Sequence, residues 1–100
     1  MVFSWNTLDA LSRDHGDGFY LVDTARFSEN YDEFLGAFRH SYPHTNLAYS
    51  YKTNYIPRLC QIVDARGGFA EVVSRMEYDL ALRIGVQPER IIFNGPYKRA

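Results

Sequence analysis

The sequence alternates short segments rich in β-forming residues with segments of helical periodicity, and this alternation limits the folds open to the chain. Strands are predicted at 18–23, 46–52, 69–73 and 90–94, with apolar residues at helical spacing in the segments between them. Strands separated by helices are typical of βαβ units, in which right-handed crossovers join parallel strands. The predicted fold class is therefore α/β with a parallel sheet.

Four helices are predicted, each from an N-terminal cap or a first-turn proline followed by an apolar stripe. These starting residues are Ser4, Ser28, Pro57 and Ser74. The last helix opens with the Ser-x-x-Glu spacing of a capping box, formed by Ser74 and Glu77, and stops at Gly85. The residues predicted to face inward on this helix are Met76, Leu80, Ala81 and Ile84.

Lys52 stands at the C-terminal end of the predicted strand 46–52. The large residues of this strand alternate with small ones, so that Ala48, Ser50 and Lys52 share the less crowded face. An amine that projects among small neighbours suits a residue that holds a bulky cofactor by a Schiff base. On the local pattern alone, the favoured interpretation is still an ordinary strand-end lysine whose amine reaches solvent.

Composition and charge argue against several classes of partner. The 100 residues carry a formal net charge of -1, with acidic and basic residues interspersed, which gives no electrostatic reason to expect nucleic acid or an anionic membrane. The longest apolar runs fall far short of the roughly 20 residues that span a bilayer. The single cysteine, Cys60, excludes an internal disulfide and fits a reducing compartment. We therefore expect a cytoplasmic location, with neither nucleic acid nor membrane as partner.

Three ordered motifs resemble one known family: YSYKTN at 49–54, GGFAEVVS at 67–74 and QPERIIFNGPYK at 87–98. Over residues 18–98 the chain is similar to the N-terminal part of fold-type III, alanine-racemase-like, pyridoxal-phosphate-dependent enzymes. Within that family it most resembles the branch of diaminopimelate and ornithine decarboxylases. A complete (β/α)8 barrel takes about 250 residues, so the resemblance implies an incomplete TIM-type barrel.

The resemblance also implies a domain organisation. Residues 1–100 would form the N-terminal portion of a barrel that binds pyridoxal 5'-phosphate. Within it, 1–23 would be a leading helix and strand, and 24–100 would be barrel βα units. In the resembled family the strand at 18–23 is also a candidate member of a neighbouring β-domain, and the sequence leaves both placements open.

By the same resemblance, Lys52 would be the catalytic residue that forms the internal aldimine with pyridoxal 5'-phosphate and later donates a proton. Glu71 would be a second cofactor-binding residue, near the hydroxyl side of the cofactor, with a solvated or salt-bridged carboxylate as the alternative. Strict alternation puts Glu71 and Ser74 on opposite faces, so both cannot point into the barrel from a regular strand. Ser74 is explained as the N-cap of the last predicted helix. Asn94 and Lys98 are explained by a turn, although a site role for either of these two residues stays open.

Two further candidate sites, a histidine pair and a cysteine, are explained without a metal-binding or catalytic role. His40 and His44 have i,i+4 spacing, but Pro43 between them breaks the helix that would align them, so no metal site is expected. Cys60 lies on the apolar stripe of its helix and is predicted to be a buried structural thiol.

Three functions remain open from the sequence. The first is a segment of a pyridoxal-phosphate-dependent amino-acid decarboxylase of the diaminopimelate type, incomplete and inactive alone, from a homodimeric parent enzyme. The Asn-Gly-Pro-x-Lys turn is the main reason for that choice. The second is a related racemase or a small cofactor-carrying barrel. The third is a non-catalytic βα module that associates through its open strand edges.

Overall fold

The computed structural model describes residues 3–96, which form four α-helices, one 3-10 turn and three short strands. In chain order they are α1 (Trp5–His15), α2 (Thr24–Ser41), β1 (Ala48–Ser50), α3 (Pro57–Ala65), β2 (Phe69–Val72), α4 (Arg75–Ile84), η1 (Pro88–Arg90) and β3 (Ile91–Phe93). No helix within this part of the chain is both long enough and apolar enough to cross a bilayer.

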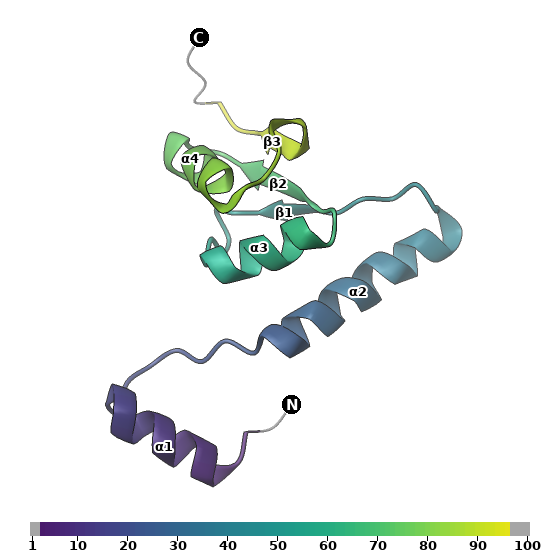
Figure 1. Cartoon of the computed structure of the whole chain (residues 1–100). Coiled ribbons are helices and arrows are strands. Elements are labelled where there is room, and N and C mark those ends of the chain that lie inside the picture. The colour runs from purple at the N-terminus through teal and green to yellow at the C-terminus, as the bar shows by residue number, and fades with distance from the viewer. Residues whose placement is uncertain (1–2, 97–100) are drawn as a thin grey trace.

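The three strands form one parallel sheet in the order β1-β2-β3 (Figure 1). Ser50 pairs with Glu71, and Glu71 pairs with Ile92, which sets the register of all three strands. Strands that follow in chain order, with each crossover helix on the same side, are the repeating unit of a (β/α)8 barrel. The predicted fold class is confirmed as parallel βα units forming an incomplete barrel.

The core lies between the sheet and helices α3 and α4, while the other face of the sheet is uncovered. Its main cluster of buried residues is Tyr51, Cys60, Ala70, Val72, Ala81 and Val86. A second cluster joins α2 to α3 through Tyr31, Leu35 and Val63. The predicted faces of the first barrel strand are confirmed, because Tyr49 and Tyr51 pack toward the helices and Ala48 is exposed.

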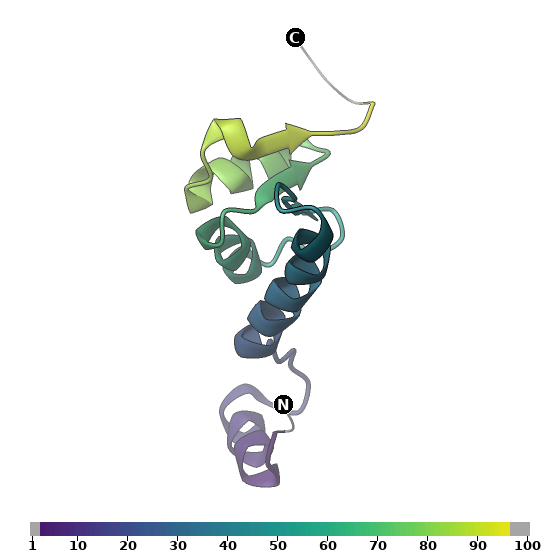
Figure 2. The ribbon, with the colours of Figure 1, turned by 90° about the vertical axis from the view of Figure 1, so that its right-hand side faces the viewer.

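The N-terminal quarter differs from the prediction. Helix α1 is capped by Ser4 as expected, but it buries no residue and stands apart from the sheet (Figures 1 and 2). The strand predicted at 18–23 is wrong: this segment has no strand partner, and Tyr20 within it is fully exposed. β-forming residues make a strand only where a neighbouring strand satisfies their backbone groups, and none of the described strands lies beside them.

Helix α2 begins five residues before the position that the sequence suggested, since its N-cap is Asp23 and not Ser28. Asp23 is its N-cap and accepts a hydrogen bond from the backbone N–H of Arg26 at 2.9 Å. The predicted cap, Ser28, instead lies inside the helix and donates to the Thr24 carbonyl at 2.8 Å. Asp and Ser are both good caps, so residue type alone did not separate the two positions.

One buried hydroxyl in this core gives a prediction. The side chain of Tyr31 is 6% exposed, and its hydroxyl has no hydrogen-bond partner among residues 3–96. Burial raises the pKa of this phenol above its usual value, which reflects the same loss of solvation. Because an unpaired buried hydroxyl costs free energy, Tyr31→Phe should leave the free energy of unfolding unchanged or raise it by up to about 1 kcal/mol.

Urea unfolding followed by circular dichroism checks this expectation. Tyr42→Phe at the exposed end of the same helix is the matched control, since Tyr42 is 72% exposed and its substitution should change nothing. A clear loss of stability in Tyr31→Phe alone would show that the hydroxyl is paired in solution.

Candidate active site at the carboxyl ends of the strands

The carboxyl ends of β1, β2 and β3 lie along one edge of the sheet, as they must in a parallel arrangement. Lys52, Ser74 and Asn94 all lie just beyond these ends. In (β/α)8 enzymes this is the edge where functional side chains gather. The structure therefore brings the three polar positions noted in the sequence to a common side of the sheet.

Lys52 lies in a turn and not within a strand, which corrects the predicted strand 46–52. Strand β1 ends at Ser50, although the Tyr51 N–H still donates to the Glu71 carbonyl at 3.0 Å and extends the ladder by one residue. The chain then turns sharply, with the N–H groups of Thr53 and Asn54 both directed to the Ser50 carbonyl. The backbone just before Lys52 is hydrogen-bonded to β2, and this pairing fixes the position of the lysine at the edge of the sheet.

The surroundings of Lys52 follow from the burial of its neighbour. Tyr51 is 1% exposed and packs into the helix-side core, and the turn that contains Lys52 begins at this residue. Lys52 is exposed in this chain and forms no ion pair with any residue from 3 to 96.

Glu71 lies on the uncovered face of the sheet. It is half-buried, whereas Ala70 and Val72 on either side of it are buried against the helices. Its register partner on β1 is Ser50, two residues before the lysine. Alternation along β2 is therefore as predicted for Ala70, Glu71 and Val72, whereas Ser74 lies beyond the strand as the N-cap of α4.

Ser74 and Asn94 are both engaged in local structure. Ser74 caps α4, because its Oγ accepts a hydrogen bond from the Glu77 N–H at 3.2 Å. The Asn94 side chain accepts from the N–H of Gly95 at 2.8 Å and so belongs to the turn after β3. Lys98 lies outside the described residues. The capping prediction for Ser74 is confirmed.

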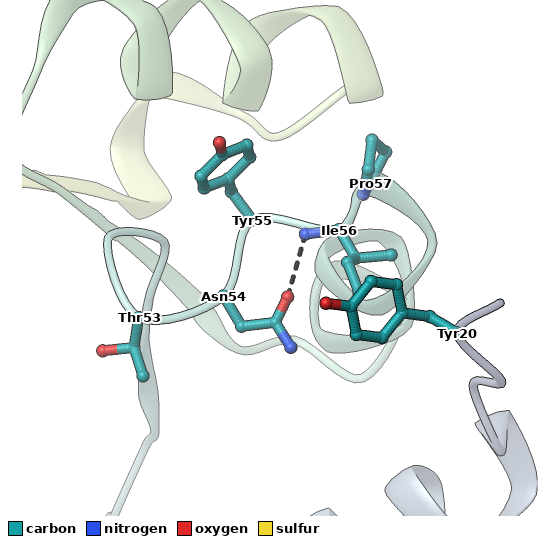
Figure 3. Close-up of a pocket in the computed structure, with 6 residues that line it drawn as sticks. All are labelled: Tyr20, Thr53, Asn54, Tyr55, Ile56 and Pro57. Carbon is teal, nitrogen blue, oxygen red and sulfur yellow. Dashed lines mark hydrogen bonds between the residues drawn. The ribbon is translucent and has the colours of Figure 1, made fainter. Parts of the chain in front are cut away.

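A shallow hollow of about 470 Å³ lies beside the lysine turn (Figure 3). It is lined by Thr53, Asn54, Tyr55, Ile56, Pro57 and Tyr20. Asn54 shapes its floor by accepting a hydrogen bond from the Ile56 N–H at 3.1 Å (Figure 3). Because Tyr20 is fully exposed, this hollow is an open depression and does not enclose a ligand.

Two other side chains that carry nucleophilic atoms, Cys60 and Tyr51, are buried in the helix-side core. Burial raises the pKa of the Cys60 thiol, which keeps it protonated at neutral pH. Burial likewise raises the pKa of the Tyr51 phenol, far above its ordinary value. The prediction of a buried structural thiol is confirmed. Residues 3–96 contain no group of three or more side chains placed to bind a metal ion.

Glu77, which the sequence indicated only as a member of the capping box, is buried. It is 5% exposed, whereas Met76, predicted to face inward, is 53% exposed. Its Oε2 accepts a hydrogen bond from the Ser74 hydroxyl at 2.7 Å, and its Oε1 is buried without a donor among the described residues. The capping-box spacing was the available signal, because it ties the third helical residue back toward the strand end.

The side chains at this edge fit a pyridoxal cofactor in one respect that the structure shows directly. The only described lysine, Lys52, offers an exposed primary amine without an ion-pair partner among residues 3–96, in the turn that follows β1. A primary amine is the donor that an aldehyde cofactor requires. Glu71 adds a carboxylate on the uncovered face of β2.

Comparison with protein families gives one match over most of the chain. Residues 29–100 match the family described as pyridoxal-dependent decarboxylase, pyridoxal binding domain. The matched region includes α3, α4 and all three strands, and it leaves α1 and the extended segment before α2 outside.

Several curated proteins are similar to the chain over a small part of their own length. Diaminopimelate decarboxylase of Aquifex aeolicus (strain VF5) is 29% identical over 89 residues, covering 89% of this chain and 20% of that protein. Diaminopimelate decarboxylase of Methanothermobacter thermautotrophicus is 31% identical over 85 residues, covering 85% of this chain and 20% of that protein. The chloroplastic ornithine decarboxylase of Nicotiana glutinosa is 29% identical over 86 residues, covering 86% of this chain and 19% of that protein.

A solved structure has the same fold. The crystal structure of AQ1208 from Aquifex aeolicus superposes with a TM-score of 0.75 at 30% sequence identity, over 92% of this chain and 22% of that one. The chain thus spans about a fifth of the length of the proteins it resembles.

Proposed function

Because the chain belongs to the pyridoxal-dependent decarboxylase family, in its pyridoxal-binding domain, we propose that Lys52 is the residue to which pyridoxal 5'-phosphate attaches. The observation that supports the proposal is the position of Lys52 in the turn just beyond the carboxyl end of β1, a strand whose small residues Ala48 and Ser50 lie on the uncovered face of the sheet. In a closed barrel this face is the interior.

The residues of this chain would act on the cofactor in two ways. Lys52 binds it covalently through Nζ and, when a substrate amine takes its place, returns a proton from Nζ. Glu71, on the uncovered face of the neighbouring strand β2, would orient the hydroxyl side of the cofactor. The bound cofactor supplies the electron sink that allows a carboxylate to leave as carbon dioxide.

The activity of the whole protein is proposed as amino-acid decarboxylation of the diaminopimelate type. Two of the relatives with the most similar sequences are named diaminopimelate decarboxylases, and the Asn94-Gly95-Pro96 turn supports the same choice. Because the chain spans about a fifth of such enzymes, we propose that it carries the lysine region only and has little activity alone. The homodimeric parent and the cytoplasmic location remain predictions.

A chimera tests the decarboxylase proposal. This chain would replace the corresponding N-terminal segment of the Aquifex aeolicus diaminopimelate decarboxylase. Release of carbon dioxide would then be measured with diaminopimelate and, separately, with ornithine. We expect release from diaminopimelate in preference to ornithine, because the remaining four-fifths of the enzyme complete the pocket.

Matched variants of the chimera separate a lysine role from a folding defect. Lys52→Arg should abolish carbon dioxide release, whereas Lys98→Arg should leave it unchanged. Inversion of the substrate without carbon dioxide release would favour the racemase alternative. Equal activity of the two lysine variants would contradict the assignment of Lys52.

A further inference from the structure

The turn after β3 places a backbone nitrogen against a side-chain amide. Asn94 is exposed and is followed by Gly95, whose N–H donates a hydrogen bond to Asn94 Oδ1 at 2.8 Å. Because Oδ1 and Cγ are one carbonyl bond apart, about 1.23 Å, the glycine nitrogen lies no more than about 4 Å from Cγ. The turn therefore holds a potential nucleophile close to the carbonyl carbon of the Asn94 amide.

The surroundings of this amide leave it open to reaction. Gly95 has a φ of 97°, a conformation that glycine adopts without strain, and it has no side chain to shield its nitrogen. The backbone N–H of Asn94 donates to the Val72 carbonyl at 2.8 Å, which fixes the start of the turn at the end of β3. The side chain of Asn94 makes no other hydrogen bond among residues 3–96.

The other asparagines of the chain lack this arrangement. Each is followed by a residue that carries a side chain, and they are Asn6, Asn30, Asn46 and Asn54. The first two lie within α1 and α2, where helical hydrogen bonds fix the backbone. The Oδ1 atoms of the last two accept hydrogen bonds from Arg39 Nη2 and from the Ile56 N–H. Within residues 3–96, only the Asn94 amide contacts the nitrogen of the next residue.

We infer that Asn94 is a site of self-modification, at which the Gly95 nitrogen closes a succinimide ring. The nitrogen loses its proton to hydroxide and attacks Cγ. The Cγ–N bond forms, the Cγ–Nδ2 bond breaks, and Nδ2 leaves as ammonia with a proton taken from water. Water then opens the ring at Cγ to give aspartate, or at the backbone carbonyl carbon to give isoaspartate. The sum of the steps is one water consumed and one ammonia released, with no oxidant or reductant.

This modification changes the candidate site itself. Either product adds a carboxylate just beyond the carboxyl end of β3, on the edge of the sheet that also holds Lys52, and makes the formal net charge of -1 one unit more negative. Isoaspartate also lengthens the main chain by one carbon immediately before Gly95. The charge and the backbone of this edge therefore change with time, without any partner.

Incubation of the folded chain at mildly alkaline pH, followed by peptide mass spectrometry, tests the inference. We expect Asn94 to lose its amide at least about tenfold faster than Asn54 in the same sample, because only glycine leaves the attacking nitrogen unshielded. The product should be a mixture of isoaspartate and aspartate, and the rate should rise with hydroxide concentration. The gain in mass distinguishes this reaction from isomerisation at Asp17-Gly18, which leaves the mass unchanged.

Asn94→Gln is the matched control, because it keeps both the amide and the following glycine but would have to close a larger ring that forms more slowly. This variant should stay intact over the same incubation. Conversion of Asn94 no faster than that of Asn54, or aspartate without isoaspartate, would overturn the inference. Neither result bears on the proposed function of Lys52, which is measured separately by cofactor attachment.

Discussion

Lys52→Arg is expected to remove nearly all reducible cofactor from the chain. After incubation with pyridoxal 5'-phosphate and reduction with borohydride, the added mass at this site should fall by at least about tenfold. A guanidinium keeps the positive charge and the length of the side chain but does not form the covalent link to an aldehyde. Mass spectrometry of the intact chain, at limiting cofactor, gives the number of labels per molecule.

The control for this expectation is the second lysine. Lys98→Arg removes the same kind of amine from the chain and should leave most of the label in place. Similar losses in the two variants would mean that the cofactor reacts with any available amine, and the proposed site would then have no support.

Gly68→Ala should destabilise the chain more than any other single methyl group added to a described glycine. A Cβ at this position would lie 2.5 Å from Val63 Cγ1 and 2.6 Å from the Tyr31 hydroxyl oxygen. Both neighbours are buried, and neither a β-branched side chain nor an aromatic ring yields easily in a packed core. We expect a loss of about 2–3 kcal/mol in the free energy of unfolding, in the upper range for overpacking.

Gly36→Ala is the matched control for this substitution. Gly36 lies within α2, and a Cβ there would meet no atom within 4 Å. Since alanine is the better helix former by about 1 kcal/mol, this variant should be more stable than the native chain. Urea unfolding of both variants measures the difference, and a Gly68→Ala chain as stable as Gly36→Ala would contradict the described packing of α2 on α3.

The sequence predicted the part of the fold in which local preference and tertiary contact agree. Alternation of large and small residues identified the buried face of β1, and the Ser74 cap identified the start of α4. The prediction of a buried Cys60 also held, because an apolar stripe at helical spacing leaves little choice of face. At the candidate site the order and spacing of three motifs identified Lys52 and Glu71 as candidates, and the structure places Glu71 on the uncovered face of β2.

The remaining features depend on contacts that local pattern does not encode. The segment 18–23 has strand-forming residues but no strand beside it among residues 3–96, so it is extended and unpaired. Hydrophobicity alone favoured Met76 over Glu77 for the inner face of α4. The hydrogen bond from Ser74 fixes the carboxylate inward instead, at a strand end where a polar group is useful.

The distribution of reduced cofactor between the two lysines tests the central claim most directly. The native chain would be labelled at limiting pyridoxal 5'-phosphate, both folded and in concentrated urea, and the labelled peptides would be quantified. We predict that Lys52 carries most of the label in the folded chain and that the preference disappears in urea. Equal labelling of Lys52 and Lys98 in the folded chain would contradict a site built around Lys52.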